Sequence, residues 1–434
     1  MKFVSTRNSS NKVSFAHAVL DCMPEDGGLY IPENFLDLRR WLLYSNENTS
    51  FPSIAGALTS AFINEEFSPI ICETIAEKAF TFEPKLKKLD DRLFALELFH
   101  TPTGSHKDFG ISYLVNTLET ILTLKNGRAV FLDATVGELG ASLALSIRGK
   151  KNLKAVLIYP RGMVRGLSES DYIWNGGNVL PIEIDGSESD CHKIVREIFA
   201  RRDLVEKYNF TVANTANIGR LMPQTFFYPY AFSRLKNQVC GDIFYAMPCG
   251  NYSNLVAGLY SWRLSLPLNG FICPTTDEIK VDLEGNCQIM DSIVNLNKRE
   301  KADPASPSNL ERLEEIFKTS SLMLRHFIFP SELSEKEGQK ACHRLFMDYG
   351  IFADECTSKS YGAALLRKEM TSEDDASVVL VMRDHPALSS DYIRHTLGEA
   401  PQMPENIANS LKAANLNRPL LKSTSDVIKA LEIL

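Results

Sequence analysis

The segment from Leu96 to Gly110 reads Leu96-Glu97-Leu98-Phe99-His100-Thr101-Pro102-Thr103-Gly104-Ser105-His106-Lys107-Asp108-Phe109-Gly110. Its apolar start predicts a strand, Pro102 and Gly104 predict the turn that ends the strand, and Ser105 is the expected N-cap of a helix. Lys107 then lies in the first helical turn, where the positive end of the helix dipole disfavours an ammonium. Imine formation with a carbonyl group requires a neutral amine. Lys107 is therefore a candidate catalytic residue, although a lysine at such a position is also commonly a solvated surface residue.

Short apolar runs on both sides of this segment alternate with helical patterns. Strands that alternate with helices predict βαβ units and a largely parallel sheet covered on both faces. The sequence therefore predicts an α/β fold. The expected strands lie at residues 93–99, 129–132, 155–159, 179–184, 243–247 and 378–382.

A second candidate site follows the strand expected at residues 243–247. The loop reads Gly250-Asn251-Tyr252-Ser253-Asn254 and leads into a helical pattern from Leu255. A small turn-prone loop between a strand and a helix points backbone N–H groups at one place, which is how helix N-termini bind phosphate. No G-K-[ST] sequence follows, so the loop is not the phosphate loop of a nucleotide hydrolase. An ordinary helix start capped by Asn254 is the alternative interpretation.

Another glycine turn joins a strand to a helix at Asp133-Ala134-Thr135-Val136-Gly137-Glu138-Leu139-Gly140. Small residues at such a turn permit close approach of the backbone to a ligand. Taken alone the pattern is weak, because glycine turns after strands are common in α/β proteins.

The N-terminal part differs from the rest of the chain. Helical patterns dominate from Ser14 to about Lys87, with one turn-rich loop at residues 24–32. We therefore expect three units: a mostly helical N-terminal domain at 1–88, a large α/β domain from 89–125 and 225–434, and a small α/β domain at 126–224. Residues 297–309 are charged and turn-rich, and they predict an exposed excursion before a helix that starts near Asn309.

Composition excludes several classes of function. Apolar residues make up 44% of the 434 residues and charged residues 23%, which suits a folded globular chain, and the net charge of −7 argues against nucleic acid as a partner. The first residues lack the apolar core of a signal peptide, and no uncharged apolar stretch reaches the roughly 18 residues of a membrane helix. The nine cysteines are scattered without a C-x-x-C pair, so neither a metal site nor disulfides are expected. The sequence predicts a cytoplasmic protein without a membrane partner.

Together these segments resemble the fold-type II pyridoxal-phosphate (PLP) enzymes, and among them the longer, bacterial and fungal type of threonine synthase. The resemblance extends over nearly the whole chain. Its motifs lie, in family order, at residues 3–7, 13–15, 24–32, 96–110, 159–162, 214–221, 250–254, 303–312 and 385–387.

The resemblance implies a fold, a cofactor and a reaction. Two doubly wound sheet domains would hold PLP between them, and O-phospho-L-homoserine and water would become L-threonine and phosphate. Lys107 would form the imine with PLP and act in catalysis, and the loop from Gly250 through Asn251, Tyr252 and Ser253 to Asn254 would bind the cofactor phosphate. Glu138 and Arg383 fall at positions beside the cofactor ring. Substrate-binding positions fall on Thr135, Gly137, Arg161, Asn217 and Arg220. A monomer or a homodimer is expected.

The chain departs from the family pattern at five positions, one of which is Glu138, where the family has a shorter aspartate or asparagine. Val136 and Leu139 stand where the family has hydroxyl residues that hold the substrate carboxylate, and Arg383 stands where it has a threonine near the pyridine nitrogen. Ser253 replaces a glycine. Two alternatives to a threonine synthase therefore stay open: a PLP enzyme of the same fold with a changed amino-acid substrate, and a non-catalytic descendant that binds PLP.

Overall fold

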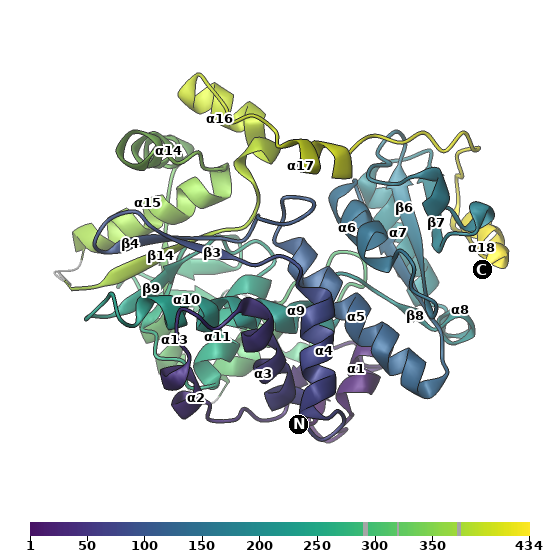
Figure 1. Ribbon diagram of the computed structural model, residues 1–434, viewed down its shortest axis with the longest axis horizontal. Helices are drawn as coiled ribbons and strands as arrows, with labels where there is room; N and C mark the ends of the chain where they lie inside the picture. The colour runs from purple at the N-terminus through teal and green to yellow at the C-terminus, as the bar shows by residue number, and fades with distance from the viewer. Residues whose placement is uncertain (290–293, 319–320, 371–374) are drawn as a thin grey trace.

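Two sheets organise the molecule, with helices packed around both (Figure 1). The computed structural model describes residues 1–289, 294–318, 321–370 and 375–434. All six strands expected from apolar runs are confirmed, which confirms the predicted α/β fold. They are β4 (Leu93–Glu97), β5 (Ala129–Ala134), β6 (Leu153–Pro160), β7 (Val179–Ile184), β9 (Ile243–Ala246) and β14 (Ser377–Met382).

The large sheet has the strand order β13-β10-β9-β14-β4-β3. Strands β10 (Gly270–Pro274) and β13 (Ile328–Ser331) are parallel to the central strands, whereas β3 (Lys85–Lys88) is an antiparallel edge strand. Two long helices, α14 (Glu335–Tyr349) and α15 (Glu355–Met370), cover one face, as Figure 1 shows above the sheet. Helices α10 (Phe227–Leu235) and α11 (Ser253–Arg263) lie on the other face.

The small sheet is parallel and has the order β7-β6-β5-β8, with β8 at Phe210–Thr211. Helix α6 (Glu138–Ile147) packs on one face, and α7 (Glu188–Phe199) with α8 (Arg202–Tyr208) packs on the other. The end of the chain also belongs to this unit. Leu421 bridges to Ile184 beside β7, and α18 (Thr424–Ala430) inserts Val427 into the core under α7.

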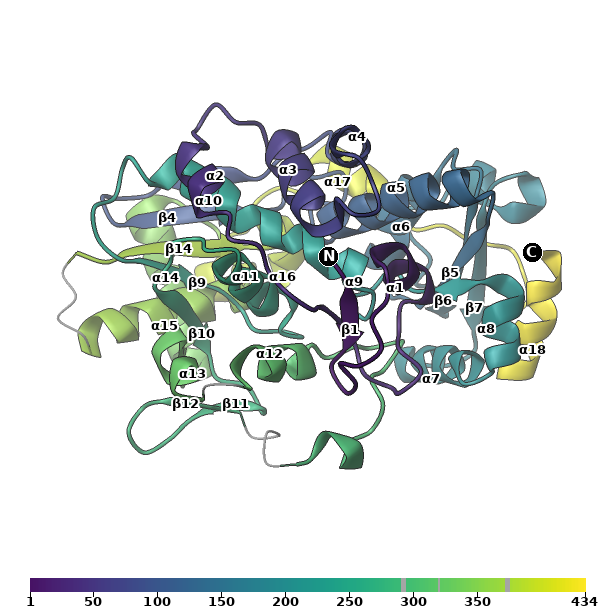
Figure 2. The ribbon, with the colours of Figure 1, turned by 90° about the horizontal axis from the view of Figure 1, so that it is seen from below.

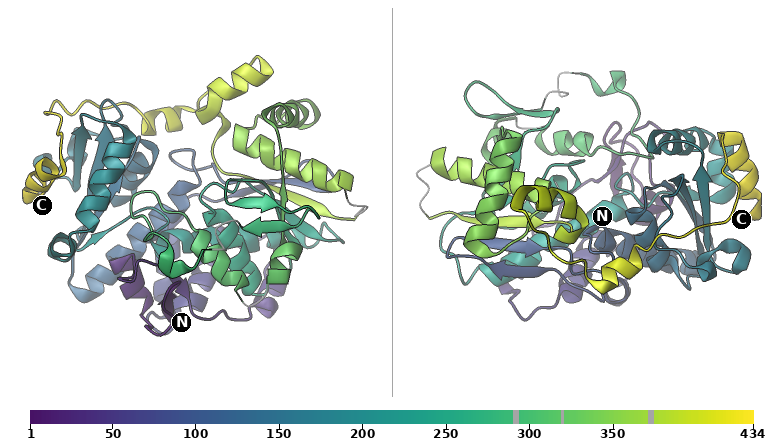
Figure 3. Two further views of the ribbon diagram at one scale, coloured as in Figure 1. Left: turned by 180° about the vertical axis from the view of Figure 1, so that it is seen from behind. Right: turned by 90° about the horizontal axis from the view of Figure 1, so that it is seen from above.

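This packing differs from the expected division of the chain, which placed all residues from 225 to 434 in the large domain. The final residues cross to the small sheet because Val427 and Leu431 complete an apolar core that α7 leaves uncovered. Figure 3 shows this crossing: the segment after α17 (Glu405–Ser410) passes from the large sheet to the small one.

The N-terminal unit is mostly helical, as expected, and its helices share one core with the large sheet. Phe51 on α3 and Phe80 after α4 meet Phe109 on α5 within a cluster of aromatic rings. The unit comprises β1 (Phe3–Ser5), α1 (Phe15–Asp21), β2 (Tyr30–Pro32), α2 (Arg39–Tyr44), α3 (Phe51–Ile63) and α4 (Pro69–Ala79), and it packs on α5 (Lys107–Lys125). Figure 2 shows α3 and α4 beside α5.

Shorter elements complete the chain. The helix expected near Asn309 is confirmed as α12, and Asn309 is its N-cap. No helix in the described part of the chain is long and apolar enough to cross a membrane. The remaining elements are α9 (Ile218–Leu221), β11 (Ile279–Val281), β12 (Cys287–Ile289), α12 (Leu310–Phe317), α13 (Ser321–Phe327) and α16 (Ser390–Leu397).

Candidate active site

The carboxyl ends of three neighbouring strands, β4, β14 and β9, bring the main sequence-predicted residues together. Lys107 follows β4, Arg383 follows β14, and Gly250 follows β9. The loops are joined directly, because the His106 N–H donates to the Arg383 carbonyl at 2.8 Å. A Cβ atom on Gly250 would lie 3.0 Å from Nη1 of Arg383. In open α/β sheets this edge of the strands is where ligands bind.

Lys107 begins helix α5, and its amine faces the small sheet. Its Nζ lies 2.5 Å from Oε2 of Glu138, which stands in the first turn of α6. This ion pair connects a helix of the large sheet to a helix of the small sheet, so both sheets contribute to the surroundings of Lys107.

The N-cap of α5 differs from the expectation. His106 occupies that position and gives no side-chain cap, whereas Ser105 donates its hydroxyl to Asp384 at 2.6 Å. The Ser105 oxygen also accepts the N–H of Lys107 at 3.3 Å, so Ser105 holds the start of α5 from one residue before the N-cap.

The loop from Gly250 to Asn254 has the geometry of an anion cradle. Gly250 and Tyr252 have φ values of 51° and 64°, and this left-handed backbone turns the chain sharply into α11. Asn254 is 2% exposed, and neither atom of its amide has a hydrogen-bond partner in the described part of the chain. A buried amide without partners is costly, so it indicates a polar ligand at this helix start. A phosphate on the N-terminus of α11 fits this requirement.

Two other side chains of this loop point outward and fix its shape. The Asn251 amide donates to the Thr215 hydroxyl at 2.9 Å. The Tyr252 hydroxyl donates to Glu278 at 2.5 Å and also lies 2.6 Å from the Thr276 hydroxyl. These bonds leave the backbone of the loop as its anion-binding surface.

The glycine turn before α6 is held by its own threonine. The Thr135 hydroxyl accepts hydrogen bonds from the N–H groups of Gly137 and Gly140, at 3.0 and 3.2 Å. Gly137 has φ of 132°, a backbone conformation that side-chain-bearing residues rarely adopt. Val136 is 43% exposed at the tip of the turn. The free end of α6 therefore points its remaining N–H groups outward beside Glu138.

The three remaining sequence-predicted substrate residues fall in different surroundings. Asn217 is fully buried, caps Gly219 at 2.9 Å, and donates to the Val19 carbonyl at 2.9 Å. Its side chain thus fixes the start of α9. Arg161 is exposed in the loop after β6 and has no side-chain hydrogen bond to the described residues.

Arg220 lies close to the lysine. It is 4% exposed, its Nε and Nη1 have no partner in the described part of the chain, and its guanidinium occupies the space that a Cβ on Gly110 would need. Burial lowers the pKa of Arg220 to about 10, while Asp108 and Asp133 act to raise it. A buried guanidinium without acceptors under the Lys107 turn is suited to bind an anion.

Two groups to which the sequence assigned no role in the site complete the surroundings. The stem of Arg165 covers Gly137, with Cδ 2.9 Å from the position of a Cβ there, and its guanidinium has no acceptor in the described part of the chain. Asn309 donates to the Asn251 carbonyl from its backbone at 3.0 Å and from its side chain at 3.1 Å. Neither has a local sequence signal, because both act on segments far away in the chain.

The buried His106 and the half-buried Asp384 form a pair beside Lys107. Burial lowers the pKa of His106 to about 4, against the effect of Asp384. Burial acts to raise the pKa of Asp384, but hydrogen bonding to His106 and the charges of His106, Lys107 and Arg383 hold that pKa well below its usual range. The pair thus keeps a carboxylate next to the lysine, where it balances the cations of the site.

Asp133 gives a pH prediction. Burial raises its pKa to about 7, despite hydrogen bonds from Ala213 and Asn214. In the unfolded chain its pKa is about 4, so between about pH 4 and 7 the folded state binds the extra proton, and the contribution of Asp133 to stability falls as pH rises.

As pH rises through this window, the Asp133 contribution to the free energy of unfolding of the parent chain falls by up to about 1.4 kcal/mol per pH unit. We expect Asp133→Asn to remove this fall. Chemical denaturation at several pH values, compared with the parent chain, checks this. The exposed Asp185→Asn is the matched control. Parallel pH curves for Asp133→Asn and the parent would show that Asp133 ionises normally.

A lysine can bind an aldehyde cofactor, and an anion cradle on a neighbouring parallel strand can bind the phosphate group of that cofactor. This fold and this pair of groups define the class of fold-type II PLP enzymes. The family model described as "Pyridoxal-phosphate dependent enzyme" matches residues 73–384, and "Threonine synthase N terminus" matches residues 2–80.

Among curated proteins, the chain is 30% identical to the threonine synthase of Buchnera aphidicola subsp. Acyrthosiphon pisum over 95% of both chains. It is 28% identical to that of Escherichia coli K12 over 94% of both. Among solved structures, E. coli threonine synthase matches with a TM-score of 0.79 at 25% identity, over 100% of this chain and 99% of that one. The PLP-bound threonine synthase of Brucella melitensis has the same fold, with a TM-score of 0.80 at 22% identity and coverage of 99% and 98%. The chain belongs to the threonine synthase family.

Proposed function

We propose that this chain converts O-phospho-L-homoserine and water to L-threonine and phosphate with PLP as cofactor, as a carbon–oxygen lyase of threonine biosynthesis. The observation that carries the proposal is the ion pair of Lys107 with Glu138 at the strand edge that also carries the anion cradle, in a chain that matches the family over 95% of its length.

The cofactor supplies an electron sink for the substrate when it is bound. Lys107 holds its aldehyde carbon covalently, and the backbone from Gly250 to Asn254 binds its phosphate. Arg383 leans toward Gly250, so its cation strengthens the phosphate cradle. Glu138 would contribute to the cofactor site from the small-sheet side, because its carboxylate reaches the Lys107 amine.

Substrate binding falls to groups around the turn before α6. The N–H groups at the start of α6 and the Arg165 guanidinium are proposed to hold the substrate carboxylate, which compensates for the hydroxyls absent at Val136 and Leu139. Gly137 allows this close approach, and Thr135 fixes the turn. Arg220 supplies a buried cation for the substrate phosphate, with Arg161 as a second candidate from the loop after β6 and Asn217 as support for the Arg220 helix.

The proton transfers fall to Lys107. With substrate bound, the free amine of Lys107 would take and return protons at the α and β carbons. Glu138 holds the ammonium form between the two steps, at the 2.5 Å contact that it makes in the structure. Phosphate leaves the γ carbon, and water adds at the β carbon.

The proposal is tested by incubation of the PLP-loaded protein with O-phospho-L-homoserine. Equal amounts of L-threonine and phosphate are expected. Release of phosphate together with a product other than threonine would favour the PLP enzyme with a changed reaction. The non-catalytic descendant would be favoured if the protein binds PLP but turns over neither this substrate nor O-acylated and hydroxy amino acids.

Arg165→Gln is expected to raise KM for O-phosphohomoserine roughly tenfold with a smaller change in kcat. A charge-assisted hydrogen bond to a bound anion contributes about 1.5 to 3 kcal/mol, and its loss from both ground and transition states appears in KM. Phosphate release measures both constants. Arg201→Gln, in an exposed ion pair with Asp203, is the control and is expected to leave them unchanged. Equal kinetics for Arg165→Gln and the control would remove Arg165 from the substrate site.

Finer features of the working protein are also proposals. We propose that it works in the cytoplasm as a monomer or homodimer, without nucleic acid or membrane partners; all nine of its cysteines are free, as a reducing compartment favours. We propose that the small sheet and the large sheet form separate α/β domains on either side of the cofactor.

A further inference from the structure

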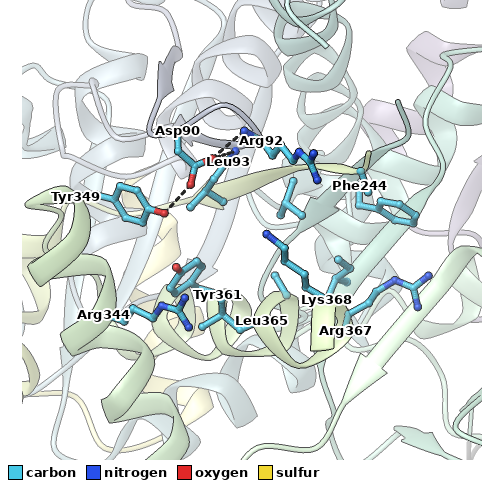
Figure 4. A pocket seen from close by; sticks show the side chains of 14 residues that line it. Asp90, Arg92, Leu93, Phe244, Arg344, Tyr349, Tyr361, Leu365, Arg367 and Lys368 are labelled. Carbon is cyan, nitrogen blue, oxygen red and sulfur yellow. Dashed lines mark hydrogen bonds between the residues drawn. The ribbon is translucent and has the colours of Figure 1, made fainter. Parts of the chain in front are cut away.

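A second cavity lies at the opposite end of the large sheet from Lys107. It has a volume of about 300 Å³ and opens between the sheet and the last turns of α14 and α15 (Figure 4). Leu93 and Val378 line it at the amino-terminal ends of β4 and β14, whereas Lys107 and Arg383 follow the carboxyl ends of the same strands. The cavity is therefore separate from the proposed active site.

The floor of this cavity is apolar. Its residues come from the sheet face that α15 covers and from α15 itself, and pockets of this volume with apolar floors suit small organic ligands. The side chains that form the floor are Leu93, Phe244, Ile272, Ala364, Leu365 and Val378.

The rim carries an excess of positive charge. Among the described residues that line the cavity, four side chains are cationic and one is a carboxylate. Two of the cations are already engaged, because Arg344 pairs with Asp348 and Arg367 lies over the Phe329 ring. Lys368 points into the open space in Figure 4 and makes no hydrogen bond or ion pair with a described residue. Arg92 has only a 4.0 Å ion pair with the exposed Asp375. Within the described part of the chain, Lys368 and Arg92 are thus the two lining cations without a close carboxylate partner.

Asp90, the one carboxylate among the described lining residues, already has hydrogen-bond donors. Asp90 accepts the Tyr349 hydroxyl at 2.6 Å and the N–H groups of Arg92 and Leu93 at 2.8 and 2.7 Å. Burial acts to raise its pKa, but these hydrogen bonds and the charge of Lys368 lower it on balance. Asp90 therefore orders the strand start and Tyr349 and does not neutralise Lys368 through a direct bond.

We propose that this cavity binds a small organic carboxylate with an apolar body. The body would lie on the Phe244 and Ile272 floor, and the carboxylate would meet Lys368 and Arg92 at the rim. An inorganic anion would leave the floor in contact with water, and an uncharged apolar ligand would leave both cations unpaired, so the observations favour a ligand that has both parts.

Calorimetric titration of the PLP-loaded protein with 3-phenylpropionate tests the proposal. Saturable binding is expected, with 3-phenylpropanamide at least tenfold weaker because it lacks the charge. Lys368→Gln is expected to weaken binding of the carboxylate at least tenfold, and Ala376→Phe, which fills the mouth, to abolish it. Lys359→Gln removes a lysine that pairs with Glu355 on the same helix and is expected to change nothing.

Several results would overturn the proposal. The absence of binding to the parent chain would do so, as would equal affinity for the amide, or equal competition by inorganic phosphate. Undiminished binding to Lys368→Gln would show that the rim does not bind the anion, even if Ala376→Phe fails to fold. Loss of binding in Arg165→Gln but not in Lys368→Gln would place the ligand at the Lys107 site.

Discussion

Replacing Lys107 by alanine is expected to abolish covalent attachment of PLP and to reduce turnover of O-phosphohomoserine by at least about a thousandfold. The loss is large because one amine both holds the cofactor and moves the protons, and positioned acid–base catalysis alone contributes about 10² to 10⁴ in rate. Borohydride reduction followed by peptide mapping locates the attachment. The cofactor is expected on the peptide that contains Lys107.

The fold is expected to survive this change. The Lys107 side chain is 34% exposed, and among the described residues it forms one ion pair, with Glu138. Lys125 lies at the exposed far end of the same helix, so Lys125→Ala is the matched control and is expected to keep the attached cofactor and full activity. Attachment to another lysine in the parent chain would contradict the assignment.

The second large effect concerns stability. Arg312 is fully buried and donates to the carbonyl oxygens of Tyr30, Thr215 and Ala216 and to the amide oxygen of Asn309. Arg312→Met leaves these four acceptors buried without donors. At about 1 to 3 kcal/mol for each unsatisfied group, a loss of at least about 3 kcal/mol in the free energy of unfolding is expected.

Chemical denaturation measures this loss, with Arg263→Met as control because Arg263 is exposed and contacts only the Phe35 ring. PLP affinity is expected to fall as well, since Asn309 binds the Asn251 carbonyl in the phosphate loop. A stability change within about 0.5 kcal/mol of the control would show that the Arg312 network does not support the fold.

The elements that the sequence predicted correctly are those with strong local patterns. The six apolar runs became strands, and Ser14 and Asn309 precede helices as N-caps. Strands β10 and β13 were not predicted, because Gly270 and Pro274 bound the first and Pro330 lies within the second, and these residues resemble turn signals in the sequence.

For the candidate site, sequence motifs predicted which loops meet but not what each side chain does. Lys107, Arg383 and Gly250 come together because parallel strands end at one edge. The burial of Arg220 against Gly110 and the packing of Arg165 over Gly137 depend on tertiary approach. The spacing of apolar and polar residues along the chain does not predict such contacts between distant segments. The return of the chain end to α7 was missed for the same reason, since its partners lie more than 200 residues away.

The central claim is the reaction itself, and oxygen labelling tests it most directly. PLP-loaded protein is incubated with O-phospho-L-homoserine in H₂¹⁸O, and both products are analysed by mass spectrometry. The account predicts one solvent oxygen in the β-hydroxyl of L-threonine and none in the phosphate, because the carbon–oxygen bond at the γ carbon breaks and water adds at the β carbon. Labelled phosphate together with homoserine would instead show simple hydrolysis of the phosphate ester, and would contradict the account.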